Sequence, residues 1–72
     1  MTVNDTIKTL MSGKNITQGE ITKRLGMKSQ SGVSQALNRD MKVSMLIRFL
    51  NTLDCDLVIR DKESGKEYMV VE

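Results

Sequence analysis

The chain has no histidine, proline or tryptophan, and its 72 residues include only one cysteine, one tyrosine and one phenylalanine. Without histidine, acid–base catalysis near neutral pH and the common zinc ligand sets lose their usual side chain. The single cysteine, Cys55, excludes an internal disulfide. No nucleophile has a candidate base, and no pair of carboxylates forms a recognisable site. We therefore predict no enzymatic activity, no cofactor and no metal.

Long apolar runs are also absent. No stretch approaches the ~20 residues that span a bilayer, and the first residues contain no apolar signal core. We expect no membrane segment and a cytoplasmic protein, a compartment that also suits an unpaired thiol. So short a chain forms at most one small domain and buries little apolar surface, so self-association is an expected source of further stability.

Charge is distributed unevenly along the chain. Residues 1–53 carry eight Lys and Arg against three acids, whereas residues 54–72 carry three against six. The chain thus has a basic body and an acidic tail, although its total net charge is only +2. A basic body favours polyanionic partners, and an unevenly charged but functionless surface is the alternative.

Apolar residues recur every three or four positions in four stretches, the spacing of a buried helical face. The predicted helices cover residues 3–12, 17–25, 30–38 and 43–53. Thr17 is the strongest start signal, because Glu20 can complete a capping box with it, and Gly26 offers an exit. We expect Ser29 to cap the third helix and Gly13 to end the first.

After Asp54 the apolar pattern alternates instead. Leu57 and Ile59 are expected on one side and Val58 on the other, and β-formers return at residues 68–71 after a loop with a late glycine. The tail is therefore predicted to be a β-hairpin, and the fold class to be mainly α, a bundle of four to five helices with this hairpin at its C-terminal end.

The outward face of the third helix is polar but almost uncharged. Its side chains are Gln30, Ser31, Ser34, Gln35 and Asn38, with no acid before Asp40. Amides and hydroxyls both donate and accept hydrogen bonds, which matches the mixed edges of bases in the major groove. A merely solvated helix would carry Lys/Glu pairs more often, but a polar surface helix without function is the alternative.

The segment TQGEITKRLGM at residues 17–27, followed by QSGV at residues 30–33, resembles the helix-turn-helix of the λ-repressor-like, or Xre, family of bacterial and phage regulators. The resemblance implies a λ-repressor-like domain over residues 1–54 that binds double-stranded DNA as a sequence-specific transcriptional regulator, in the role of a repressor. The third helix would lie in the major groove. Residues 55–72 would be a separate hairpin tail.

The family also implies roles for single residues. The glutamine that opens its third helix reads adenine and the one that opens its second helix braces it, roles that fall here to Gln30 and Gln18. Ser31 and Asn38 would contact a base edge and a phosphate. The predicted base-reading residues are Gln18, Gln30, Ser31, Ser34 and Gln35. The predicted phosphate contacts are Lys14, Lys23, Lys28, Asn38, Arg39 and Lys42. Thr22 stands where the second and third helices would cross, so its hydroxyl needs a carbonyl partner.

Proteins with this motif usually act as two-fold dimers on half-sites one helical turn apart. The hairpin is the predicted dimer interface, through Leu57, Ile59, Tyr68 and Val70. A hairpin that folds back onto its own helices is the alternative. A second function of another class is a protein-binding module, either an antitoxin that neutralises a toxin or a phage-encoded inhibitor of a host enzyme.

Overall fold

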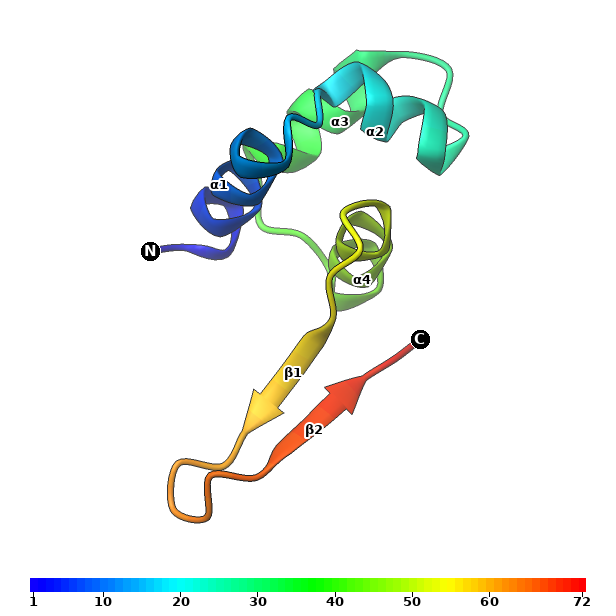
Figure 1. The fold of residues 1–72 in the computed structure, drawn as a ribbon. Helices are drawn as coiled ribbons and strands as arrows, with labels where there is room; N and C mark the ends of the chain where they lie inside the picture. The colour runs from blue at the N-terminus through cyan, green and yellow to red at the C-terminus, as the bar shows by residue number, and fades with distance from the viewer.

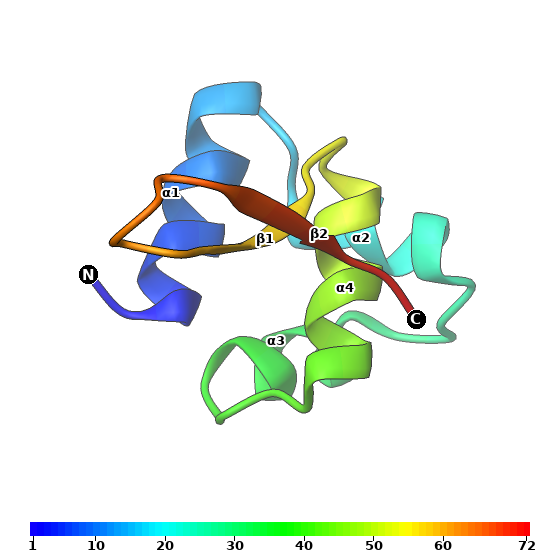
Figure 2. The ribbon, with the colours of Figure 1, turned by 90° about the horizontal axis from the view of Figure 1, so that it is seen from below.

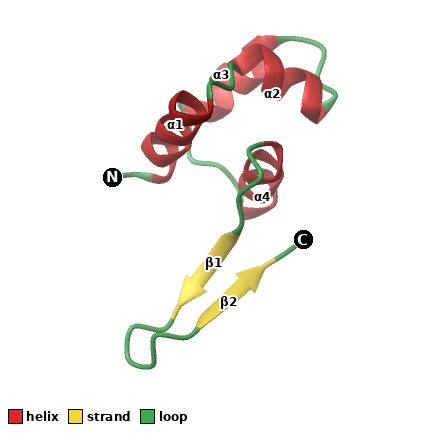
Figure 3. Ribbon diagram, viewed as in Figure 1, coloured by secondary structure: helices red, strands yellow, loops and turns green.

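The computed structural model describes all 72 residues as four helices followed by a two-stranded antiparallel hairpin (Figures 1 and 3). The elements are α1 Val3–Lys14, α2 Gln18–Leu25, α3 Gln30–Leu37, α4 Val43–Thr52, β1 Leu57–Arg60 and β2 Glu67–Val70. The predicted mainly helical chain with a C-terminal hairpin is confirmed, with four helices rather than five. None of the four combines the length and the apolar character needed to cross a membrane.

Helix α1 begins with a cap that the sequence analysis missed and ends later than expected. The Thr2 hydroxyl accepts from the Asp5 N–H, and the Asp5 carboxylate accepts from the Thr2 N–H, which completes a capping box. The prediction that Gly13 ends the helix was wrong. The chain stays helical through Gly13, and Asn15 takes the left-handed conformation at φ 56°. Asparagine tolerates this region better than other residues with a side chain, so no glycine is needed there.

Helix α2 begins and ends where the sequence predicts. The Thr17 hydroxyl accepts from the Glu20 N–H at 3.2 Å, and Gly26 leaves the helix in the left-handed region at φ 71°. The predicted return bond from Glu20 to Thr17 is not formed. The Glu20 carboxylate pairs instead with Arg24, one turn further along, at 3.2 Å. A charged partner at this spacing competes successfully with the backbone N–H.

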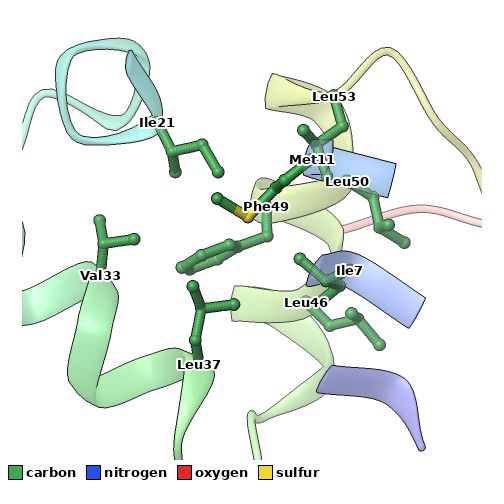
Figure 4. Close-up of a cluster of buried hydrophobic side chains, with 9 residues drawn as sticks. All are labelled: Ile7, Met11, Ile21, Val33, Leu37, Leu46, Phe49, Leu50 and Leu53. Carbon is green, nitrogen blue, oxygen red and sulfur yellow. The ribbon is translucent and has the colours of Figure 1, made fainter. Parts of the chain in front are cut away.

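The core forms where α4 meets the other helices, and Phe49 lies at its centre (Figure 4). The Phe49 side chain is fully buried, as are Ile21 of α2 and Val33 of α3. The nine residues of the core are Ile7, Met11, Ile21, Val33, Leu37, Leu46, Phe49, Leu50 and Leu53. All four helices contribute to this cluster, so a single core fixes how they pack.

Sulfur-containing side chains contribute to this core and to its margin. Met11 is buried, and Met27 and Met41 are half-buried against the core cluster. Cys55 is also half-buried, and its thiol donates to the Leu53 carbonyl at 3.4 Å. These side chains pack as flexible or small apolar groups.

Two polar contacts between distant segments add to the apolar core. The Arg24 guanidinium donates to the Thr52 carbonyl at 2.5 Å and so joins α2 to the end of α4. The Asn4 amide donates to the Arg39 carbonyl at 2.7 Å and joins α1 to the α3–α4 connection. The last turn of α2 and the segment after α3 are therefore each tied to another helix.

The hairpin projects away from the helices (Figure 1), and in the view from below it lies in front of α1 and α4 (Figure 2). Its strands pair in the register Leu57–Val70, Val58–Met69, Ile59–Tyr68 and Arg60–Glu67. Only its inner end approaches the helices, where Leu57 and Val70 are half-buried. Further out, Ile59 and Tyr68 stay 64% and 57% exposed. The hairpin therefore does not fold back onto its own helices along most of its length.

We predict that Phe49→Ala removes most of the stability of this small domain. Emptying the space of a buried phenylalanine costs about 3–5 kcal/mol. Val43→Ala in the same helix is the matched control, because Val43 is 58% exposed and its loss should change the free energy of unfolding by less than about 0.5 kcal/mol. Urea unfolding followed by circular dichroism measures both, and similar losses in the two variants would contradict this description of the core.

Candidate nucleic-acid interface

Four residues, 26–29, connect α2 to α3, and the two helices pack closely where they cross. Gly26 turns the chain, and the next N–H, from Met27, donates to the Thr22 carbonyl at 3.0 Å. Thr22 is buried, and its hydroxyl donates to the Gln18 carbonyl at 2.7 Å. The expected carbonyl partner of Thr22 is thus present, and the crossing holds no unsatisfied hydroxyl.

The orientation of α3 is set by its apolar residues. Val33 and Leu37 are buried in the core, and Ala36 beside them is half-buried. The opposite side carries the polar strip of α3, which we define as Gln30, Ser31, Ser34, Gln35 and Asn38. Members of the strip are exposed except for the half-buried Ser34. The residues predicted to read bases from α3 therefore lie together on one accessible face.

Most hydrogen-bonding capacity on this strip is unused within the protein. The carboxamides of Gln30 and Gln35 make no intramolecular hydrogen bond, and neither does the hydroxyl of Ser34. Asn38 donates one N–H to the Ser34 carbonyl at 3.0 Å, which leaves its second N–H and its oxygen free. The strip can therefore offer both donors and acceptors to a ligand.

The start of α3 differs from the prediction. Ser29 occupies the N-cap position, but its side chain makes no capping hydrogen bond. Its hydroxyl lies 2.7 Å from the hydroxyl of Ser31 instead. The predicted cap position at Ser29 is therefore correct, but its capping hydrogen bond is not formed, because a second hydroxyl two residues away is the nearer partner. The first N–H groups of α3 consequently remain without a side-chain acceptor.

The two glutamines that open α2 and α3 are not joined by a hydrogen bond. Gln18 is half-buried and its carboxamide has no intramolecular partner. The carboxamide of Gln30 lies against Gly19, where a β-carbon would be only 2.9 Å from its Nε2 atom. The bracing hydrogen bond that the family resemblance implies between Gln18 and Gln30 is thus not formed, and the Gln30 carboxamide lies beside Gly19 instead.

Basic side chains flank both ends of the polar strip. An open hollow at the start of α3 is lined by Lys23 and Lys28 together with Gln30. A second hollow, at the end of α3, is lined by Arg39 and Lys42 together with Gln35. Lys14, at the end of α1, lines neither hollow. The predicted phosphate contacts of α2, α3 and their connections therefore lie on both sides of the predicted base-reading residues.

None of these cations is neutralised within the protein. The single ion pair is the one between Glu20 and Arg24. Lys23, Lys28 and Lys42 are exposed and have no carboxylate within 4.0 Å. Glu20 borders the hollow at the start of α3 with its charge paired to Arg24, and Asp40 borders the hollow at the end of α3. The four cations therefore outnumber the carboxylates around the strip.

Two glycine contacts escaped the sequence analysis. Gly19 makes room for Gln30, and Gly32 makes room for the end of Met27, since a β-carbon at Gly32 would collide with the Met27 methyl carbon. The only sequence signal was the occurrence of glycine within predicted helices, where it is normally disfavoured. Spacing along one helix does not reveal which side chain of a second helix fills that space.

The contrast between the two helix starts leads to a prediction. Thr17→Ala should lower the free energy of unfolding by about 1 kcal/mol, because it removes the acceptor of the Glu20 N–H. Ser29→Ala should change it by less than about 0.5 kcal/mol, since no capping bond is lost. Thermal unfolding of both variants tests this, and a loss at Ser29 equal to that at Thr17 would show that Ser29 caps α3 in solution.

The chemistry available at this surface is recognition through hydrogen bonds and positive charge. No group of three or more Cys, Asp or Glu side chains is arranged to hold a metal ion. No protein-family model, curated protein or solved structure matches this chain. The resemblance of residues 17–33 to the λ-repressor-like family therefore stays a prediction, and the function has to be inferred from the geometry of α2, α3 and the cations around them.

Proposed function

We propose that this chain is a λ-repressor-like helix-turn-helix regulator that binds double-stranded DNA with α3 in the major groove. The observation that carries the proposal is the polar strip of α3, which is exposed, free of carboxylates and bordered by cations at both ends. A surface helix without a ligand gains nothing from this combination. A helix that approaches base edges between two phosphate backbones needs all of it.

Base reading would depend on the free amides. A glutamine carboxamide can make two hydrogen bonds to adenine in the major groove, and each good pair of this kind discriminates by about 1–3 kcal/mol. Gln30 opens the strip and Gln35 lies one turn before its end at Asn38, and neither carboxamide has a competing partner in the protein. Ser31 and Ser34 lie between them and can either donate or accept. The strip is therefore suited to contact several adjacent base pairs.

Phosphate contacts would come from the flanking residues. Lys23 and Lys28 border the start of the strip, and Arg39 and Lys42 border its end, so the two groups can reach the backbones on opposite sides of the groove. Asn38 has a free N–H for the same purpose, whereas Lys14 would contribute only at longer range. These contacts fix the position of α3 without selecting a sequence.

A regulator of this size needs a second copy for selectivity. One such module reads only a few base pairs, and two-fold dimers double the site. Leu57, Ile59, Tyr68 and Val70 lie on one face of the hairpin and support its role as the dimer interface, because the outer two remain exposed in the single chain. Such a dimer bound over a promoter would act as a repressor by excluding the polymerase.

A second candidate function is supported by the opposite face of the hairpin. Val58 and Met69 pair across the strands on that face and are 43% and 61% exposed. If one face joins two copies, these residues stay available for a protein partner such as a toxin or a host enzyme. This role is compatible with DNA binding, because the hairpin points away from α3 (Figure 1).

The division between phosphate and base contacts can be tested by two substitutions. We expect Lys28→Ala to weaken binding to all duplexes alike and to reduce the slope of log K against log salt by about one ion. We expect Gln30→Ala to reduce the preference for the selected duplex over a random one by roughly fivefold or more. The duplex is first obtained by selection from a random pool, and affinities are measured by fluorescence anisotropy at several salt concentrations.

The control for charge is Lys62→Ala in the hairpin loop, which removes the same charge far from the strip and should leave both quantities nearly unchanged. Failure of the unaltered protein to enrich any sequence would contradict the proposed function. Equal losses on selected and random duplex for Gln30→Ala would contradict the role of Gln30 in reading bases.

The dimer interface can be tested by placing a negative charge on one apolar face of the hairpin at a time. Ile59→Glu places a charge on the predicted interface face and should convert the dimer to a monomer in sedimentation equilibrium. Met69→Glu is the matched control, because Met69 is similarly exposed but lies on the opposite face. It should stay dimeric. A monomeric unaltered protein would refute the dimer, and dissociation by Met69→Glu alone would move the interface to the other face.

A further inference from the structure

Gly19 lies in the first turn of α2, where nothing in the backbone requires a glycine. The glycines with positive φ are Gly26 and Gly65, so Gly19 has an ordinary helical conformation. Glycine is one of the poorest helix formers, and alanine would serve a helix better. The reason for glycine here must therefore be space rather than backbone conformation.

The space is filled by the side chain of Gln30, which reaches across from the start of α3. A β-carbon on Gly19 would lie 2.9 Å from the Nε2 atom of Gln30 and 3.7 Å from its Cδ atom. The first distance is shorter than real contacts of a β-carbon, so the carboxamide could not keep its place beside any other residue. Only glycine leaves room for the Gln30 carboxamide at this place beside the first turn of α2.

We infer that Gly19 is a positioning residue for sequence recognition, which holds the carboxamide of Gln30 in the orientation that reads a base pair. This inference rests on the proposed function. The contact with Gly19 limits the motion of the carboxamide but uses none of its donors or acceptors, because Gln30 makes no hydrogen bond within the protein. The amide is thus kept in place and remains free to bond to a base edge.

The expected effect of Gly19→Ala on DNA recognition depends on how precisely the Gln30 carboxamide must be placed. Groups that recognise a ligand must lie within about 0.5 Å of their productive position. A β-carbon at position 19 would lie 2.9 Å from Nε2, and ordinary contact begins at 3.4 Å, so Nε2 has to move by about 0.5 Å or more. Because Nε2 is the end of a flexible side chain, it can move at little cost to stability. Gly19→Ala should therefore impair recognition and leave folding intact.

The experiment combines Gly19→Ala and Gln30→Ala in a double-mutant cycle on the full chain. The probes are the duplex that the unaltered protein enriches from a random pool and its single-base-pair variants. We expect Gly19→Ala to reduce discrimination at one base pair by about threefold or more, at the same base pair where Gln30→Ala acts. In the presence of Gln30→Ala, adding Gly19→Ala should have less than about a twofold further effect.

Gly13→Ala is the matched control, because Gly13 lies in α1, is exposed and has no atom within 4 Å of the position of its β-carbon. It should leave base preference unchanged. Both glycine variants should melt at or above the temperature of the unaltered protein, since alanine is the better helix former. The side-chain amide resonances of Gln30 in a ¹⁵N-correlated NMR spectrum should shift in Gly19→Ala and stay in place in Gly13→Ala.

The outcomes separate this inference from the proposed function. If the unaltered protein enriches no sequence, the proposed function fails and the inference fails with it. If it enriches one and Gln30→Ala relaxes the preference while Gly19→Ala does not, DNA reading stands and the positioning role of Gly19 is overturned. An equal effect of Gly19→Ala with and without Gln30, or unshifted Gln30 amide resonances, would also overturn it.

Discussion

The packing of Phe49 is the constraint on which the candidate interface depends. Its ring is directed from α4 toward Val33 and Leu37 of α3, and Ile21 of α2 lies beside it (Figure 4). Protein interiors are close-packed, so a change in this contact is transmitted to the helices around it. Because Val33 and Leu37 must point inward to meet the ring, the polar strip of α3 must point outward. The accessibility of the strip is thus a consequence of the core.

The sequence predicted the helices well because each has a regular apolar period and most have definite ends. Gly26 was predictable as an exit because glycine adopts the left-handed conformation without the steric penalty that a β-carbon brings. Caps made by side chains were harder to predict. Ser29 has a second hydroxyl within reach and Glu20 has a guanidinium within reach, and such competition between nearby partners is not visible in spacing. Asn15 likewise replaced Gly13 at the end of α1.

The same distinction applies to the candidate site. The polar strip could be predicted from residue types and helical period, because both are properties of α3 alone. The contact between Gly19 and Gln30 could not, because it depends on how closely α2 approaches α3 at their crossing. The family resemblance points to a glutamine on α2 as the support for Gln30. In this chain the Gln30 carboxamide lies instead beside Gly19, the next residue along α2, and the contact is steric rather than a hydrogen bond.

The hairpin is the part of the molecule that most needs a partner to be stable. A two-stranded ribbon is only marginally stable by itself, and this one leaves Ile59, Tyr68 and Met69 more than half exposed. Its outer strand edges also keep unpaired N–H and carbonyl groups, which favour pairing with another chain. The acidic residues of the tail lie on this projecting element and not beside the polar strip. The two charge regions of the sequence therefore become two surfaces, a basic one suited to a polyanion and an acidic one suited to a protein.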